Sequence, residues 1–157
     1  MFDQIGGLPV HVLVIHATVV FVPLLALGAI VYAVLPHWRP RIGWAVILLA
    51  IVSPIVAWIS KESGTKLYDR LIARGLSGKG KEMLDNHMGF GTLTFWFTLA
   101  LGVVALATTF VTLRKSGSLP RVAGIGLSVI MIGLAVICGY YVVRTGDSGA
   151  HVVWGTY

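Results

Sequence analysis

The chain has 157 residues, of which 57% are hydrophobic and only 11% are charged, and its mean hydropathy is +0.88. This balance lies outside that of a soluble domain and leaves no room for an independent soluble unit. The net charge of +6 comes from basic residues that cluster beside apolar stretches, without interleaved exposed aromatics, which argues against nucleic acid as a partner. A single cysteine, Cys138, excludes a disulfide or a thiolate metal cluster within one chain.

Four stretches free of Asp, Glu, Lys and Arg follow one another along the chain. Each is long enough to cross a hydrocarbon core about 30 Å thick, which takes about 20 residues of helix. A lipid bilayer is therefore the expected surrounding. The pattern predicts an all-α integral membrane four-helix bundle, a single domain over residues 1–157, with spans at about 10–35, 42–60, 88–113 and 122–143.

The connections between the spans predict the orientation. The two short connections, 36–41 and 114–121, carry five basic residues and no acidic one, whereas residues 61–87 mix six basic with four acidic residues. By the positive-inside rule the short turns face the cytoplasm, so both termini and the longer loop face outward from the cell membrane. Within that loop, Leu67 and Leu71 belong to an apolar face that predicts a short amphipathic surface helix, and residues 77–81 predict a flexible break.

Several functions are disfavoured by what the spans lack. Transporters and proton pumps need ionised groups at membrane depth, and the four stretches contain none. Ser53, Ser60 and Ser128 have no histidine expected at the same depth, so no enzymatic activity of the chain's own is expected. Small residues in the third and fourth spans predict close helix packing, among them Gly102, Gly124, Gly126, Gly133 and Gly139.

The histidines carry the main indication of chemistry. His11, His16, His87 and His151 fall in the outward half of the predicted bundle, and His37 alone falls in a cytoplasmic turn. Counted at 1.5 Å per residue from the cytoplasmic ends of their spans, His11 lies about 36 Å and His87 about 39 Å away, so they share one level. His16 lies about 29 Å away and points about 140° from His11, so these two are not expected to bind one ion together.

Two kinds of site fit these positions, because neutral imidazole binds iron, copper and zinc. In the first, His87 and either His16 or His11 are axial ligands of haem b between the first and third spans. In the second, His11 and His87 bind a transition metal ion at the outer surface, with further ligands from Asp3, Asp85, Asp147 or His151. The alternative is that the histidines are interfacial or hydrogen-bonded groups with no cofactor.

Three motifs resemble one family. The segment from Gly7 to Leu25, GLPVHVLVIHATVVFVPLL, resembles the GxPxHPxxVHFP opening of a widespread bacterial family of small four-helix membrane proteins, a domain of unknown function. NHMGFGTL, which contains His87, is similar to the start of that family's third helix. TGDSGAHVVWG, which begins at Thr145, is similar to its closing TGxxGGxLVYxxG segment.

By motif position, His11, His16 and His87 carry over from the family, whereas His151 falls where the family often has an ordinary polar residue. The chain departs from the opening pattern at Val12, Ala17 and Thr18. The resemblance implies an electron-transfer setting, because family members look like partners of redox proteins and are sometimes joined to cytochrome or iron–sulfur modules.

Two functions follow from these observations. In the first, the protein is a haem- or metal-binding component of a membrane electron-transfer system, and its site lies at the outward ends of the first and third spans. In the second, it is a structural or accessory subunit that packs against a larger membrane complex, or against other copies of itself, with its histidines serving as interface groups.

Overall fold

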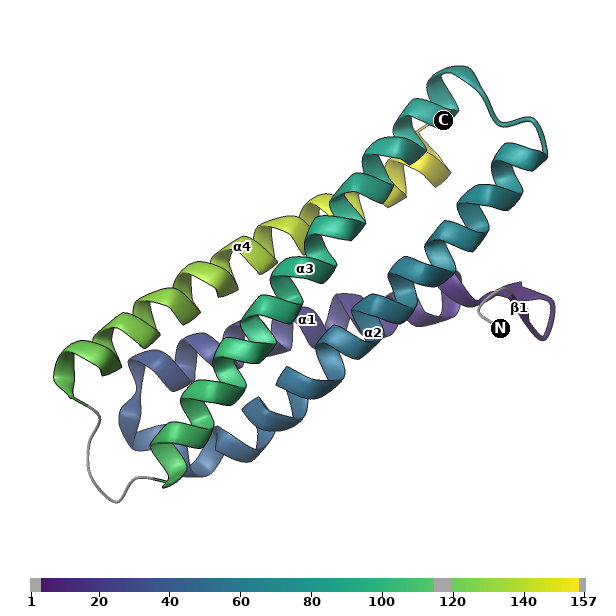
Figure 1. Ribbon diagram of the computed structural model, residues 1–157. Helices are drawn as coiled ribbons and strands as arrows, with labels where there is room; N and C mark the ends of the chain where they lie inside the picture. Colours follow the sequence, from purple (N-terminus) through teal and green to yellow (C-terminus); the bar gives the residue numbers. More distant parts are fainter. Residues whose placement is uncertain (1–3, 115–119, 156–157) are drawn as a thin grey trace.

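The computed structural model describes residues 4–114 and 120–155 and confirms an all-α four-helix bundle (Figure 1). The helices are α1 (Val10–Val34), α2 (Arg39–Ala73), α3 (Gly78–Arg114) and α4 (Arg121–Trp154), and a 3-10 turn, η1 (Pro36–Trp38), lies between α1 and α2. A small hairpin of β1 (Gln4–Ile5) and β2 (Leu8–Pro9) precedes them. Its turn uses Gly6 and Gly7, whose φ values of 58° and 83° favour glycine.

Each helix packs against two others, and the order around the bundle is α1, α2, α3, α4 and back to α1. Consecutive helices run antiparallel, so α1 and α3 are parallel and lie diagonally opposite each other (Figure 1). Figure 1 also shows that the β1–β2 hairpin, the last turns of α4 and the α2–α3 connection lie at one end of the bundle. We call this the terminal end.

The α2–α3 connection is not the longer loop that the sequence predicts. α2 continues to Ala73 and α3 begins at Gly78, so only residues 74–77 separate the two helices. Gly75 and Gly78 have φ values of 93° and 61°, a left-handed conformation that lets the chain reverse within this short turn. The predicted separate surface helix is therefore wrong, because Leu67 and Leu71 belong to the last turns of α2.

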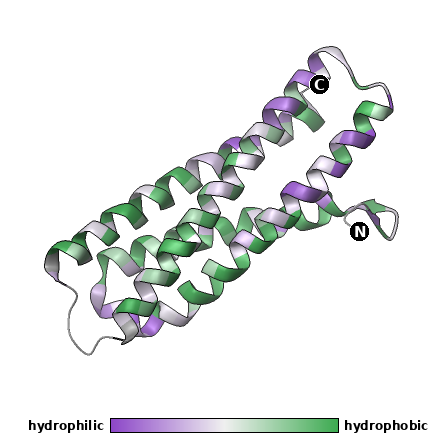
Figure 2. Cartoon of the chain, in the orientation of Figure 1, coloured by the Kyte–Doolittle hydropathy of each residue, from purple (hydrophilic) through white to green (hydrophobic). Residues whose placement is uncertain are grey.

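The helices thus extend beyond the four uncharged stretches. α4 likewise runs on past residue 143, as far as Trp154. Figure 2 shows that the hydrophilic residues gather on these added turns at the terminal end, whereas the remainder of each helix is mainly hydrophobic. Charge marks where a helix leaves the apolar part of the bundle and does not mark where the helix ends.

The surface of the bundle is apolar. Leu27, Val103 and Val129 expose 59%, 57% and 63% of their surface. The residues two positions away on the same helices, Leu25, Leu101 and Met131, are completely buried. Water would make such an outer surface a strong aggregation site, whereas hydrocarbon solvates it, and all four helices are long and apolar enough to span a membrane. The membrane environment predicted from composition fits this surface.

α2 and α3 approach each other closely at Gly102. Because Pro54 has no backbone N–H, the carbonyl of Ala50 loses its partner within α2. A Cβ atom on residue 102 would lie 2.7 Å from the oxygen of that carbonyl and 2.9 Å from Cγ of Pro54, closer than real Cβ atoms come. The predicted packing role of Gly102 is confirmed, since only glycine admits this approach.

The glycines of the first part of α4 do not pack within the bundle. A Cβ atom on Gly124, Gly126, Gly133 or Gly139 would meet nothing within 4 Å. α4 turns a different face inward, which carries Met131, Ala135, Cys138 and Val142. These four glycines therefore do not bring helices of this chain together, and packing of their face against a helix of another chain stays a prediction.

Gly102→Ala is expected to destabilise the bundle by roughly 1–3 kcal/mol, because the added methyl group overpacks the contact with Ala50 and Pro54. Gly126→Ala is the matched control, since its methyl group meets no neighbour within 4 Å. Thermal unfolding of both variants in detergent, followed by circular dichroism, measures the difference. Equal melting temperatures for the two variants would contradict the close approach of α2 and α3.

Candidate functional site

Two histidines meet at the terminal end of the bundle. His11 is the second residue of α1, and His87 lies in the third turn of α3. Their ring centroids are 6.1 Å apart and their planes are inclined by 83°. Because α1 and α3 are diagonal partners, this contact crosses the centre of the bundle. The contact agrees with the prediction, from the rise of a helix, that His11 and His87 lie at the same depth.

The ring of His11 is held by α2. Its Nδ1 lies 2.9 Å from the carbonyl oxygen of Ser60. The ring also packs on Gly64, one turn further along α2, where a Cβ atom would lie 3.1 Å from ring atoms of His11. Thr18 adds a second link between α1 and α2, because its hydroxyl donates to Oγ of Ser60 over 3.0 Å. These contacts fix which way the imidazole points.

The ring of His87 is held by α4 in the same manner. Its Nδ1 lies 3.1 Å from the carbonyl oxygen of Thr145 and 3.1 Å from Oγ of Ser148. A Cβ atom on Gly149 would lie only 2.9 Å from Cε1 of His87. Thr94 and Thr145 join their hydroxyls over 2.8 Å. His87 is almost completely buried, with 8% of its surface exposed.

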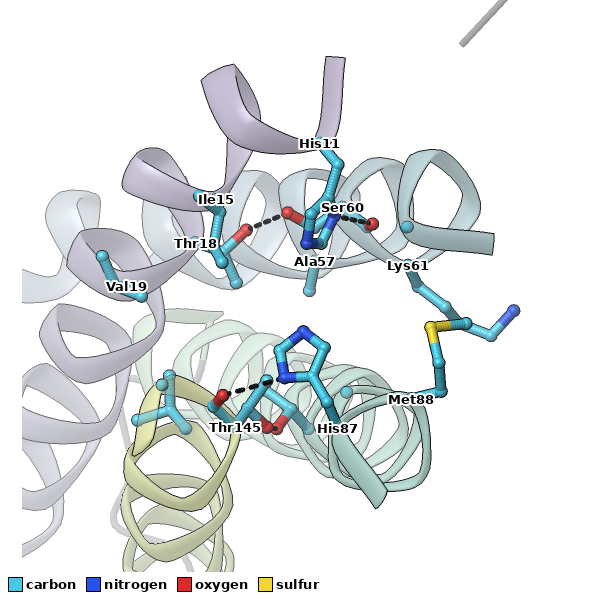
Figure 3. Close-up of a pocket in the computed structure, with 15 residues that line it drawn as sticks. His11, Ile15, Thr18, Val19, Ala57, Ser60, Lys61, His87, Met88 and Thr145 are labelled. Atoms are coloured by element: carbon cyan, nitrogen blue, oxygen red, sulfur yellow. Dashed lines mark hydrogen bonds between the residues drawn. The ribbon is translucent and has the colours of Figure 1, made fainter. Parts of the chain in front are cut away.

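These hydrogen bonds determine the chemistry of the pair. A carbonyl oxygen only accepts, so Nδ1 of each ring carries a proton, and Nε2 of the neutral imidazole is left with a lone pair. Figure 3 shows both rings entering one cavity from opposite sides, with the second nitrogen of each ring on the cavity side. The cavity has a volume of about 50 Å³ and its wall is mainly apolar. Two electron-pair donors therefore face the same small space.

The other predicted ligands lie elsewhere. His16 is exposed, and its Nδ1 is bonded to the carbonyl of Val12 in its own helix. Its ring points away from the direction of His11, because five residues turn a helix through about 500°, which leaves the two side chains about 140° apart. His151 is also exposed, with Nδ1 2.8 Å from the carbonyl oxygen of Asp147, on a face of α4 that does not contain Thr145. Neither histidine lies with His11 and His87.

Asp85 is exposed and already paired. Its carboxylate accepts hydrogen bonds from Lys81 over 2.6 Å and from the hydroxyl of Tyr68 over 2.7 Å. These two donors, Lys81 first, lower the pKa of Asp85. Asp3 lies outside the described residues. Within residues 4–114 and 120–155, no three His, Cys, Asp or Glu side chains are grouped to hold an ion, so the predicted surface metal site is not assembled there.

Sequence reasoning missed the groups that position the two rings. Ser60 is predicted to lie away from any histidine, and this is wrong, because its carbonyl binds His11. Gly64 carries no motif of its own, although the run around it in α2 is similar to that around Ser148 and Gly149 in α4, which belong to the closing TGDSGAHVVWG segment.

Sequence comparison places the whole bundle in one family. The model of a family described as predicted membrane protein (DUF2231) matches residues 7–156. The chain belongs to the DUF2231 family. No curated protein and no solved structure matches it. The matched part of this DUF2231 protein includes all four helices and both facing histidines, and it confirms the family resemblance of the motifs near His11, His87 and Thr145.

Chemical modification of the histidines tests this arrangement. Diethyl pyrocarbonate is expected to modify the exposed His16 and His151 rapidly and the buried His87 several times more slowly, because the reagent must reach a ring nitrogen. Mass spectrometry of the detergent-solubilised protein at increasing reaction times measures each rate. Ser148→Leu, which crowds the polar support of His87, should bring its rate closer to that of His151. Equal rates for His87 and His151 in the unaltered protein would contradict the burial of His87.

Proposed function

We propose that this DUF2231 protein is an electron-transfer component of a cell membrane, in which His11 and His87 together bind the iron of haem b. One observation carries the proposal. The two imidazoles face each other at a centroid distance of 6.1 Å, and each has its Nδ1 committed to a backbone carbonyl. In histidines that bind a metal, the ring nitrogen that does not touch the metal typically donates a hydrogen bond in this way, which fixes the tautomer.

The facing lone pairs call for an electron-pair acceptor between them. Nearby hydroxyls are already engaged, since Thr18 donates to Ser60 and Thr94 bonds Thr145. Two lone pairs directed into one apolar cavity repel each other, and in a medium of low dielectric constant that repulsion is weakly screened. A metal ion between them converts the repulsion into two bonds.

The distance suits ligands on opposite sides of one metal atom. A metal–nitrogen bond to imidazole is about 2 Å long, so two rings bonded in line to one metal have centroids about 6 Å apart. The number of protein ligands favours iron in a porphyrin. Zinc sites usually take three or four protein ligands, whereas haem brings four nitrogens and needs only two axial side chains.

Haem demands more room than the cavity provides as it stands. About 50 Å³ holds a bare ion, whereas organic ligands of considerable size fill pockets of roughly 300–1,000 Å³. The additional space has to come from separation of the α1–α2 pair from the α3–α4 pair. The cavity wall at this boundary includes small residues, namely Ala57, Gly91 and Gly146. Haem iron would supply a one-electron redox change, while the protein supplies two oriented nitrogens and an apolar wall.

Charge supports an outward location for the site. Residues 36–41, which form η1 and the first residues of α2, are basic and free of acidic residues, and they lie at the end of the bundle opposite the histidines (Figure 1). Under the positive-inside rule that end faces the cytoplasm. The site formed by His11 and His87 would then be accessible to an electron-transfer partner on the outer side of the membrane.

The test is an optical spectrum with iron analysis of protein purified in detergent from cells supplied with haem precursors. The expected result is about one haem per chain, with a Soret band and a low-spin spectrum. His11→Ala and His87→Ala should each abolish the low-spin spectrum, because each removes one axial ligand. His16→Ala and His151→Ala are matched controls and should leave it unchanged.

Absence of both haem and stoichiometric metal from the purified protein would contradict the proposal. So would a low-spin spectrum that survives in His87→Ala. If the purified protein contains a stoichiometric metal without porphyrin, the ligand of the two nitrogens is a bare ion and not haem.

An accessory role is a second candidate, and the open glycines of α4 favour it. α4 is the least buried helix, with 17% of its most apolar stretch buried against 28–39% in the others. Gly126 and Gly133 leave space for another helix to come close. In this role the protein would use that face to pack against another membrane subunit or a second copy.

Gly133→Leu tests the accessory role, because the new side chain fills this face at a position where a Cβ atom meets nothing within 4 Å. The expected result is loss of a co-purifying subunit, or of a dimer, in a native gel of gently solubilised membranes. Leu27→Ala, a change on the exposed face of α1, is the control and should leave assembly intact. An unchanged assembly in Gly133→Leu would remove this candidate.

A further inference from the structure

The two halves of the chain carry the same residues at the same spacing. Seven positions separate His11 from Thr18 in α1, and seven separate His87 from Thr94 in α3. Identical residues recur at 10, 14 and 18 positions after each histidine, namely Phe21, Leu25 and Ala29 in α1 and Phe97, Leu101 and Ala105 in α3. The leucine and the alanine of both sets are 0% exposed. α1 and α3 therefore carry both their site residues and their core residues at the same spacing from the histidine.

The second helices of the two halves also match. α2 carries SKESG at 60–64, and α4 carries TGDSG at 145–149. In both runs a hydroxyl residue is followed by an acid two positions later and then by Ser-Gly. Ten positions before each run lies a buried alanine, Ala50 or Ala135, and each is 2% exposed. The spacing is thus common to the site and to the core.

The hydrogen bonds repeat as well. Each histidine donates from Nδ1 to the carbonyl of the first residue of the matching run. The hydroxyl of the serine three positions later lies within hydrogen-bonding distance of that same carbonyl, at 3.1 Å for Ser63 and 3.0 Å for Ser148, although Ser63 also contacts the carbonyl of Ile59 at 2.7 Å. The threonine seven positions after each histidine bonds the hydroxyl of the same first residue.

Glycine ends both runs for one steric reason. A Cβ atom on Gly64 would lie 3.1 Å from the ring of His11, and one on Gly149 would lie 2.9 Å from the ring of His87. Each glycine follows by four residues the carbonyl that its histidine binds, so carbonyl and glycine occupy one face of the helix on successive turns. The same helix surface receives an imidazole in each half.

The arrangement of the helices relates the two halves by a rotation. The order around the bundle is α1, α2, α3, α4, so exchanging α1 with α3 and α2 with α4 leaves the ring unchanged. A two-fold axis parallel to the helices performs this exchange, since α1 and α3 are parallel. The axis passes between His11 and His87, which lie on diagonal helices and meet at the centre.

We infer that the chain is a tandem duplication of one helix-pair unit and that its two halves build one symmetric site on the axis between them. Each half supplies an equivalent Nε2, and Ser63, Gly64, Ser148 and Gly149 are matched positioning residues that hold the two rings. The ligand sits on the axis and is bound equally by both halves. The identity of that ligand rests on the proposed function, whereas the matching of the two half-sites does not.

The first test needs no ligand. His16, His37 and His151 are exposed, so their joint replacement by glutamine leaves a protein with His11 and His87 as its only histidines. Nitrogen-15 NMR of labelled histidine in this metal-free variant reports which ring nitrogen carries the proton. The expected result is two neutral rings, both protonated on Nδ1. A ring protonated on Nε2, in either half, would overturn the inference.

The second test compares matched variants with hemin as the probe. Gly64→Ala and Gly149→Ala should each displace their own ring and weaken hemin binding by a similar factor, roughly 10- to 100-fold, as loss of groups that support metal ligands does. Gly89→Ala and Gly139→Ala, whose added methyl groups meet nothing within 4 Å, are controls and should leave the affinity unchanged. An effect confined to one half would overturn the symmetric site.

The two tests separate the inference from the proposed function. If the unaltered protein fails to bind hemin while both rings are protonated on Nδ1, the haem proposal fails and the duplicated half-sites stand. If hemin binds but the two rings carry different tautomers, the haem proposal stands and the symmetry fails. Glycine variants that do not fold are replaced by Ser63→Ala and Ser148→Ala, which should each shift only the signals of their own histidine.

Discussion

The hydrogen bond from Nδ1 of each histidine to a backbone carbonyl is the interaction on which the site depends. It ties α1 to α2 through His11 and α3 to α4 through His87. It also settles which nitrogen of each ring is free, because a carbonyl can only accept. Without it the two imidazoles would have neither a fixed direction nor a fixed tautomer, and their approach to 6.1 Å would have no chemical consequence.

The surrounding bilayer explains why these contacts are built from backbone and small side chains. In hydrocarbon, polar groups have to find partners inside the protein, and close approach of helices is obtained where side chains are small. Gly64 and Gly149 give each ring its place, and Gly102 lets α3 reach a carbonyl that Pro54 leaves without a helical partner. The bilayer thus accounts both for the apolar exterior of the bundle and for the internal pairing of its polar groups at the terminal end.

The sequence predicts the number of helices, the membrane environment and the equal level of His11 and His87, because each follows from uncharged length and from the rise of a helix. It does not predict that most of the charged segment 61–87 belongs to α2 and α3, with only residues 74–77 between them, since charge reports on solvent and not on helix ends. The sequence also does not predict how each helix is rotated about its own axis. That rotation turns His16 and His151 away, opens Gly126 and Gly133 to the surroundings, and brings Ser60 and Thr145 to the histidines.

The central claim is that one metal atom is bound by both facing imidazoles. Pulsed electron paramagnetic resonance of the ferric, haem-loaded protein, with its histidines labelled with nitrogen-15, tests this most directly because it detects the nitrogens bonded to iron. Binding by both imidazoles predicts couplings to two equivalent imidazole nitrogens, reduced to one in His11→Ala and in His87→Ala. Coupling to a single imidazole, or two couplings that survive either substitution, would contradict it.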